Sequence, residues 1–237
     1  MSKHLKRLAA PRTVRIHRKE HVWMTKPSPG PHRIEQSLSL LSVVRDFLQL
    51  CDLQKEAKRI IVTGNILVDG VKRKNHQFPC GFMDVVSLPE LKKDYRVLFD
   101  RKGKLMLVPI PADNATWKLC RIENKTVLRG KKIQLNLHDG TNIIVPKDEY
   151  TTGDVLKIDL KEKKIVEVFP FKKGTVCMIV GGRHIGQTAN IEDVEVVASS
   201  KPNLAKMKGI TEFSTITEYV FPIGLTKPII ALPEVTM

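Results

Sequence analysis

Residues 55–70 read KEAKRIIVTGNILVDG, and this stretch decides the fold of the first half of the chain. The spacing of Ala57, Ile60 and Ile61 predicts a short helix over 54–62 that turns these three side chains inward. Basic residues fall on or beside its outward face: Lys55, Lys58 and Arg59. A helix with an apolar face and a basic face packs on a core and leaves its charges available to a partner.

A small sheet is predicted directly after this helix. Gly64 is the candidate C-cap, because glycine commonly ends helices. Ile66–Val68 reads as a strand, Asp69–Gly70 as a tight turn and Val71 as the start of the returning strand. Asp84–Leu88 is expected to add a third strand. Basic residues flank the turn: Lys72, Arg73 and Lys74.

Upstream, residues 37–51 carry a second helical pattern. Apolar residues recur there at the spacing of one helix face: Leu40, Leu41, Val44, Phe47, Leu48 and Cys51. Ser37 is the expected N-cap, because serine accepts a hydrogen bond from the first free N–H groups of a helix. Helix, helix and small sheet therefore follow one another over 37–94, and Phe78, Phe82 and Met83 are expected in the core of this part.

Residues 1–36 read as a basic arm with a net charge of +7, nearly half of the excess of the whole chain. Four prolines prevent a long helix in it. Trp23 and His32 are candidates for stacking on bases or filling a groove, while a disordered solvated tail is the competing interpretation. The basic residues of the arm are Lys3, Lys6, Arg7, Arg12, Arg15, Arg18, Lys19, Lys26 and Arg33.

From about residue 95 the chain changes to hairpins with period-2 alternation. The strand pairs are 95–99 with 104–108, 133–137 with 141–145, and 155–160 with 164–169. Residues 95–170 are therefore expected to form a central β domain, as a small barrel or sandwich. Its basic candidates are Lys125, Arg129, Lys131 and Lys132.

A further strand-rich unit begins at residue 171, so the expected class is α+β with several domains. Gly174, Gly182 and Gly186 punctuate its first part, and Arg183 and His184 are expected to meet a partner from a glycine-flanked loop. For Gly174 a purely structural turn is an equal alternative. Residues 199–237 carry four prolines and are expected to be irregular or to lie at sheet edges.

Composition points to a phosphate-binding protein. The 237 residues carry a net charge of +15 and a pI of about 9.7, which is typical of nucleic-acid partners. An anionic membrane surface could attract the same charge, but no apolar run approaches the ~20 residues of a spanning helix. The four cysteines are far apart, so we expect buried or half-buried thiols and no metal site.

The sequence gives little support for an enzyme. It contains no G-x-x-x-x-G-K-[ST], G-x-S-x-G or H-E-x-x-H motif. Residues 181–186 read GGRHIG, but no helix pattern follows them to hold a pyrophosphate. We therefore expect no catalytic residue, no cofactor and no small-molecule substrate.

Two segments resemble known RNA-binding modules. Residues 55–70 look like the core of the S4-type RNA-binding fold, and residues 173–186, KGTVCMIVGGRHIG, resemble the KOW motif of SH3-like barrels. Both occur in this order, after a similar basic arm, in the small-subunit ribosomal protein S4e family. The phrases GPH at 30–32, PCGFMDV at 79–85 and KLC at 118–120 are also similar to that family.

The resemblance implies a structural, non-enzymatic role in the small ribosomal subunit, in the cytoplasm, with ribosomal RNA and neighbouring ribosomal proteins as partners. The expected domains are the arm at 1–36, an S4-like domain at 37–94, the central β domain at 95–170 and a KOW-type β domain at 171–237. Two alternatives remain. One is an RNA-modifying enzyme that carries the same αα-β module, and the other is a ribosome-associated translation or transcription factor.

Overall fold

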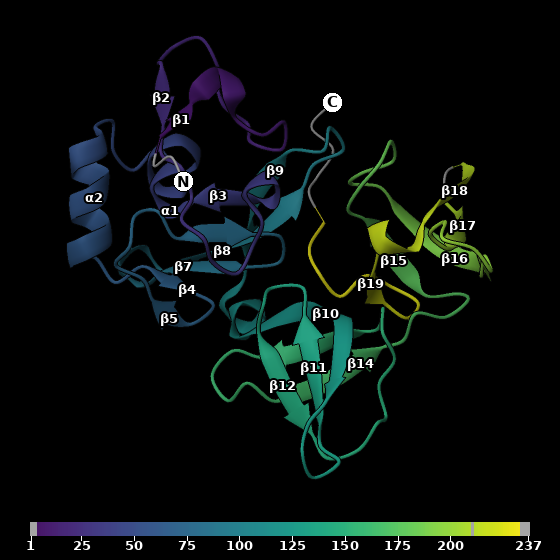
Figure 1. Ribbon diagram of the computed structural model, residues 1–237. Helices are drawn as coiled ribbons and strands as arrows, with labels where there is room; N and C mark the ends of the chain where they lie inside the picture. The colour runs from purple at the N-terminus through teal and green to yellow at the C-terminus, as the bar shows by residue number, and fades with distance from the viewer. Residues whose placement is uncertain (1–3, 210, 233–237) are drawn as a thin grey trace. The chain divides into compact units, whose positions relative to one another are not determined.

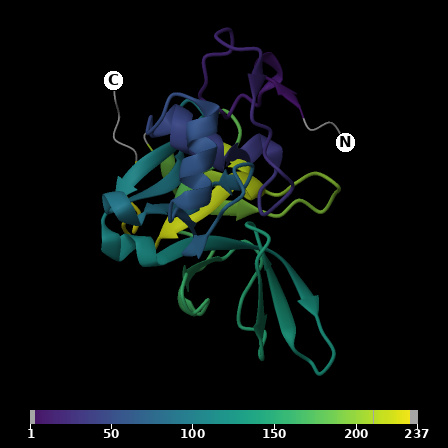
Figure 2. The ribbon, with the colours of Figure 1, turned by 90° about the vertical axis from the view of Figure 1, so that its left-hand side faces the viewer.

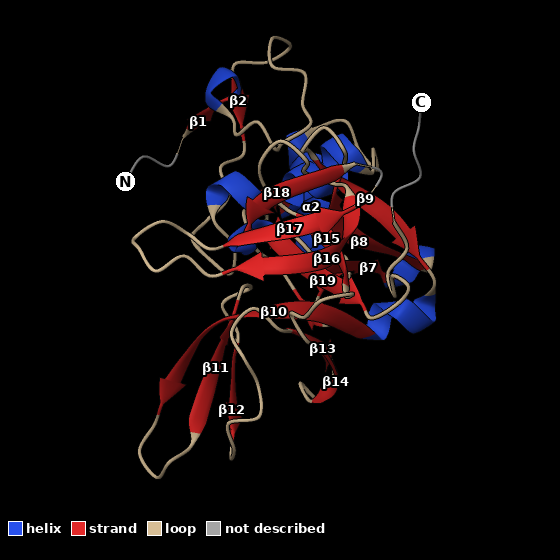
Figure 3. Ribbon diagram, turned by 90° about the vertical axis from the view of Figure 1, so that its right-hand side faces the viewer, coloured by secondary structure: helices blue, strands red, loops and turns tan. Residues whose placement is uncertain are grey.

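The structure, a computed structural model, describes residues 4–209 and 211–232 and is built mainly from strands (Figure 1, Figure 2 and Figure 3). The chain forms two compact units, each described by itself below. Unit 1 contains Met1–Leu98 and Lys104–Lys118, and unit 2 contains Phe99–Gly103 and Leu119–Met237. A mostly β, multi-domain architecture with few helices agrees with the coarse expectation. None of the helices in the described residues has the length and apolar content to cross a membrane.

The helical part of unit 1 follows a short strand in the chain. Strand β3 (Ser37–Ser39) leads into α1 (Leu40–Ser42), which continues as a π-helical turn over Val43–Phe47. Helix α2 follows at Gln54–Thr63. The prediction that Ser37 caps the first helix was wrong. Ser37 pairs with Gly81 in the β3–β6 ladder, and the Ser39 hydroxyl accepts the cap hydrogen bond from the Ser42 N–H at 3.2 Å.

Helix α2 confirms the expected helix after residue 54. Ala57 and Ile61 are fully buried, and the Leu53 N–H donates to the Glu56 carboxylate at 3.3 Å at the start of the helix. Gly64 ends it and donates its N–H to Ile60 O at 2.7 Å. Its backbone is extended, with φ of −67°, so a left-handed conformation is not the reason for glycine here. A Cβ at this position would collide with the Ile60 carbonyl oxygen.

Unit 1 is completed by a five-stranded sheet in the order β5-β4-β7-β8-β9. The strands are β4 (Leu67–Val68), β5 (Val71–Lys72), β7 (Val85–Leu88), β8 (Lys93–Phe99) and β9 (Leu105–Ile110). The predicted turn at Asp69–Gly70 joins β4 to β5, with φ of 52° and 73°. Positive φ at both central residues makes a tight hairpin turn, which suits Asp and Gly. The predicted strands at 66–68 and 84–88 are confirmed.

The N-terminal residues are joined to unit 1 by hydrogen bonds. Strands β1 (Leu5–Lys6) and β2 (Trp23–Met24) pair, with a 3₁₀ turn at Arg7–Ala9, and a second 3₁₀ turn covers Ile34–Gln36. The Ser28 N–H donates to Gln77 O at 2.8 Å, and the Leu105 N–H donates to Thr13 O at 2.7 Å. Strand β3 also pairs with β6 (Pro79–Gly81). The arm, as far as it is described, therefore belongs to the fold of this unit.

The first sheet of unit 2 has the order β12-β11-β10-β13-β14. Its strands are β10 (Trp117–Val127), β11 (Ile133–Leu137), β12 (Asn142–Val145), β13 (Val155–Asp159) and β14 (Ile165–Phe169). The hairpins predicted after residue 130 are confirmed. Cys120, Leu135 and Leu156 are fully buried in its core. The boundary between the units falls inside β10, because Lys118 belongs to unit 1 and Leu119 to unit 2.

The second sheet of unit 2 has the order β18-β17-β16-β15-β19. Its strands are β15 (Val176–Ile179), β16 (Thr188–Glu195), β17 (Leu204–Lys208), β18 (Glu212–Ile216) and β19 (Val220–Gly224), and short 3₁₀ turns lie at Pro89–Leu91, Ala112–Thr116 and Thr217–Tyr219.

The expectation that residues 199–237 are irregular or at edges was wrong for β17, which lies inside this sheet. Ala205 and Met207 are buried there while Lys206 and Lys208 are exposed, an alternation visible in the sequence. The edge position of Pro222 in β19 agrees with the expectation.

Candidate nucleic-acid interface

Helix α2 presents the clearest basic face of unit 1. Lys55, Lys58 and Arg59 are exposed, whereas Ala57 and Ile61 are buried. Lys72 on β5 is also exposed and donates a hydrogen bond to Asn65 Oδ1, close to the end of the helix. Helix and hairpin therefore carry cations on adjoining elements, which is the placement expected for several contacts along a phosphate backbone.

A pocket of about 230 Å³ brings the N-terminal residues together with α2. It is lined by Trp23 and Lys26 from the arm and by Lys58 and His76 from the body of unit 1. Trp23 is 55% exposed. Burial and the nearby Lys58 ammonium lower the pKa of His76, which favours its neutral form. A basic hollow beside an exposed indole can hold a phosphate and stack a base.

Several of the predicted basic residues are exposed at other places in unit 1. Lys3 lies outside the described residues. The exposed lysine and arginine side chains among the described residues of the arm are Lys6, Arg12, Arg15, Lys19 and Arg33. Lys26 is half-buried.

Other predicted basic residues are engaged with their own chain. Arg18 donates from its guanidinium to the carbonyl oxygens of Leu8, Ala10 and Pro11 at 2.8–3.1 Å, so it holds the first turn of the arm. The Arg73 guanidinium lies 4.3 Å from the centre of the Phe78 ring. These contacts give Arg18 and Arg73 a structural part in unit 1.

In unit 2 the turn between β10 and β11 carries Arg129, Lys131 and Lys132, all exposed. Figure 3 shows these two strands as a long twisted ribbon with the turn at its far end. Lys125 differs from them, because its ammonium contacts Asp148 Oδ1 and Tyr150 O, each at 2.6 Å. The turn is therefore the part of this predicted basic set that is open to a partner.

The glycine loop between β15 and β16 exposes Arg183, while the half-buried His184 stacks on Phe213 with ring centres 4.0 Å apart. No helix follows the loop, as predicted, because Thr188–Glu195 is a strand. Gly182 lies beside the Tyr219 ring, and at Gly186 a Cβ would collide with the Asp100 carbonyl. At both positions the close neighbour is the protein itself. Gly174, with φ of 88°, has open space around it.

A buried polar cluster at the centre of unit 1 did not follow from the sequence. His32 Nε2 lies 2.8 Å from Asp84 Oδ2, and the Lys118 ammonium lies 2.6 Å from Asp69 Oδ2 and 3.4 Å from Asp84 Oδ1. The side chains of His32 and Asp84 are 4% and 2% exposed. His32 is therefore not available for stacking on bases, which was one of the two roles considered for it, and it fixes the arm to the sheet.

The two carboxylates of this cluster are shifted in opposite directions. Burial raises the pKa of Asp69 to about 7, and the adjacent Asp84 carboxylate adds to that rise. Burial acts in the same direction on Asp84, but His32, Lys118 and the Gly81 N–H together hold the pKa of Asp84 well below its ordinary value. Asp84 is therefore the lasting negative charge in the cluster, and Asp69 the carboxylate that titrates near neutrality.

No disulfide joins the four cysteines, all of which lie in the described residues, and three of the thiols are buried, as expected. Cys120, His138 and Asp139 come together in unit 2 with possible ligand atoms within 4.8 Å of one another. Asp139 Oδ1 accepts hydrogen bonds from the Thr141 N–H and hydroxyl, and the Cys120 thiol lies 3.6 Å from Asp139 Oδ2. The hydrogen bonds from Thr141 hold the Asp139 carboxylate in this group, and the absence of a metal site stays a prediction.

Known proteins are similar to this chain over nearly its whole length. A profile of the RS4NT (NUC023) domain matches residues 1–35, and one described as ribosomal family S4e matches residues 91–165. The small ribosomal subunit protein eS4 of Methanothermobacter thermautotrophicus is 48% identical over 234 residues, covering 98% of this chain and 96% of that protein. The chain belongs to the ribosomal protein S4e family.

Other members of the S4e family are similar to this chain over nearly the same span. The eS4 protein of Archaeoglobus fulgidus is 47% identical over 97% of each chain. The crystal structure of the 30S ribosomal protein S4e from Thermoplasma acidophilum matches with a TM-score of 0.71 at 35% identity. It covers 80% of this chain and 95% of that one. The resemblance first visible in three short phrases thus extends over nearly the whole S4e-family chain.

Proposed function

We propose that the chain is a structural constituent of the small ribosomal subunit, in the cytoplasm, that binds and stabilises ribosomal RNA through phosphate-directed basic surfaces. The observation that carries this proposal is the basic face of α2 beside the Lys58–Lys26 pocket, in a member of the ribosomal protein S4e family. Exposed cations spaced over adjoining elements bind the RNA backbone by releasing condensed counterions, and they need no enclosed pocket.

Within this role, the S4-like domain at 37–94 grips RNA with α2 and the β4–β5 hairpin. The central β domain at 95–170 contributes the β10–β11 turn, and the KOW-type domain at 171–237 contributes Arg183. The division at residues 36, 94 and 170 follows the resemblance, whereas the compact units divide the chain differently, at 98–104 and 118. We assign the chain no catalytic role, because ribosomal protein families are generally structural.

Sedimentation tests the proposal. Extract from the source organism is run through sucrose gradients at low and at high salt, and the full-length chain is detected with an antibody. We expect it to travel with small subunits in constant ratio at both salt concentrations. A chain that leaves the subunits in moderate salt is a translation factor, and a chain that stays at the top of the gradient in low salt is not ribosomal at all.

A further inference from the structure

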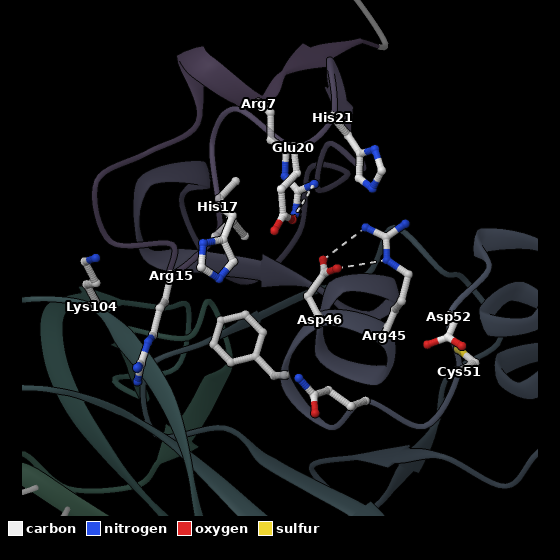
Figure 4. A pocket seen from close by; sticks show the side chains of 13 residues that line it. Arg7, Arg15, His17, Glu20, His21, Arg45, Asp46, Cys51, Asp52 and Lys104 are labelled. Atoms are coloured by element: carbon white, nitrogen blue, oxygen red, sulfur yellow. Dashed lines mark hydrogen bonds and ion pairs between the residues drawn. The ribbon is translucent and has the colours of Figure 1, made fainter.

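A pocket of about 1020 Å³ in unit 1 lies between the N-terminal residues and the π-helical turn (Figure 4). Its basic lining consists of Arg7, Arg15, His17, His21, Arg45 and Lys104. Arg45 is committed to its neighbour, because its guanidinium contacts both oxygens of Asp46 at 2.8 and 3.1 Å. The remaining groups leave the pocket with an excess of cations over the acids that line it.

Arg7 is unusual in this lining. The residue is 4% exposed, and its Nε and Nη1 atoms are buried without a hydrogen-bond acceptor in the described residues. Its ion pair is with Glu20, whose Oε2 lies 3.8 Å from Arg7 Nη1, too far for a hydrogen bond. Burial of a guanidinium with unsatisfied donors is unfavourable in free energy, because its hydrogen bonds to water are lost and are not replaced by hydrogen bonds to the protein.

The Glu20 carboxylate is held only weakly beside the Arg7 guanidinium. Its side chain is 55% exposed, and in Figure 4 its carboxylate points toward the Arg7 guanidinium. An exposed carboxylate in a long ion pair contributes little to stability and can swing into solvent at small cost. The guanidinium it would leave behind is planar, always charged and shaped to donate two parallel hydrogen bonds to an anion.

We propose that Arg7 receives one phosphate of the ribosomal RNA backbone, and that Glu20 occupies this place in the free protein until RNA displaces it. The inference rests on the proposed function and names one specific contact within it. A phosphodiester offers two non-bridging oxygens, which share one negative charge, at the spacing of the guanidinium fork. Arg15 and Lys104 stand at the same pocket, where they meet the neighbouring phosphates of the strand.

The nature of the pocket favours a backbone phosphate over a small organic ligand. Pockets for small molecules are mostly apolar with a few polar groups. Here Ile16 and Phe47 stand among a lining that is otherwise almost entirely charged or polar. Such a lining is suited to a charged group that arrives on a larger chain and remains hydrated on its outer side.

The test uses the full-length chain and an in vitro transcript of small-subunit ribosomal RNA, with affinity measured across a salt series. Glu20→Gln removes the competing carboxylate at an exposed site, so it should raise the affinity about threefold to tenfold at low salt. Glu90→Gln is the matched control, because Glu90 is exposed in the same unit and does not line the pocket. It removes the same charge and should change the affinity less than twofold.

Arg7→Gln and Arg7→Lys complete the set. Arg7→Gln should lower the affinity at least tenfold and reduce the slope of log K against log salt by about 0.7 to 0.9, the value of one phosphate contact. Arg7→Lys keeps the charge without the fork and should fall between. Glu20→Gln should have no effect in the Arg7→Gln background.

Equal affinities of the Glu20→Gln and Glu90→Gln chains would overturn the inference, even if Arg7→Gln fails to fold. If the wild-type chain does not bind the transcript, the proposed function fails and the inference fails with it. Wild-type binding together with equal glutamine variants overturns the inference alone and leaves the proposed function standing.

Discussion

At the scale of single residues, a buried cluster in unit 1 brings together two carboxylates that titrate differently. Its members are His32, Asp69, Asp84 and Lys118. Two carboxylates share one ammonium and one imidazole in a site largely withdrawn from water. Like charges at such distances cannot both ionise without cost, so one carboxylate keeps its proton to a higher pH. The raised pKa of Asp69 identifies it as the carboxylate that keeps its proton, and the lowered pKa of Asp84 as the one that ionises first.

Asp69→Asn should change how the stability of unit 1 depends on pH. The folded-state pKa of Asp69, about 7, lies above the unfolded value of about 4, so the folded state binds the proton more tightly. Stability from this group is complete below pH ~4 and is lost as the pH rises through 7. Over pH 5 to 8 the wild-type free energy of unfolding should fall by on the order of 2 kcal/mol through this group.

The asparagine side chain does not titrate, so the variant should lack this part of the fall. Asparagine tolerates the φ of 52° at this turn, and its carbonyl can still accept the hydrogen bond from the Val85 N–H. Urea unfolding followed by circular dichroism at several pH values provides the measurement. Identical pH slopes for the two chains would show that Asp69 is already ionised throughout this range.

The sequence contained a partial signal for this cluster. Three phrases that resembled the S4e family, at 30–32, 79–85 and 118–120, each contribute one member of it. Gly81 belongs to the same set, because a Cβ there would collide with the His32 ring. Residue types alone could not show that segments 34 and 52 residues apart meet, since only the folded sheet brings them together.

At the scale of elements, the sequence predicted the bounds of α2 closely. It predicted the helix before α2 but not the residue at which that helix begins. The apolar spacing over 40–51 is helical, but three serines stand near its start and the pattern cannot choose the cap among them. Pairing of β3 with β6 takes Ser37 into a strand, so the helix begins at Leu40. The π-helical turn shifts Arg45, Asp46 and Phe47 relative to an α-helix, and all three line the Arg7 pocket.

The basic face of α2 gives a prediction at this scale. Replacing Lys55, Lys58 and Arg59 together with Gln should reduce affinity for the small-subunit RNA transcript at least tenfold. The slope of log K against log salt should fall by about 2. Folding should be unaffected, because Gln is a good helix former and these side chains are exposed.

A control with the same loss of charge is available in unit 2. Lys161, Lys163 and Lys164 are exposed at the β13–β14 turn and are not among the predicted RNA contacts. Their replacement with Gln should alter the affinity for the same transcript less than threefold, with both triple variants measured by filter binding. If both triple variants lose affinity equally, the attraction is general to the charge of the chain and α2 has no special part in it.

At the scale of the whole molecule, the strongly basic first 36 residues illustrate what composition can and cannot predict. Charge and proline content predicted an arm without a long helix, which agrees with the described residues. The same features suggested a segment separate from the domains. The structure instead places His32 in the central cluster and Thr13 against β9, because a few hydrogen-bonding residues within the arm match partners far along the chain.

Removal of residues 1–36 should therefore destabilise unit 1 as well as weaken RNA binding. Asp84 would lose the imidazole at 2.8 Å, and loss of one partner of a buried ion pair typically costs about 3–5 kcal/mol. Urea unfolding should show a loss of at least ~3 kcal/mol in the truncated chain. The full-length chain with Gln at Arg12, Lys19 and Arg33 should retain its stability, and a truncated chain as stable as that control would contradict the prediction.

Strand β10 begins in unit 1 and continues in unit 2, and this has a consequence for the nascent chain. Lys118, near the start of this strand, follows Asp84 by 34 residues. At ~5–20 residues per second, a chain under synthesis waits about 2–7 s between these two residues. During that time Asp84 has His32 but not its lysine. The buried cluster of unit 1 can therefore form no earlier than the synthesis of Lys118, so the centre of this unit is completed by the last of its own residues.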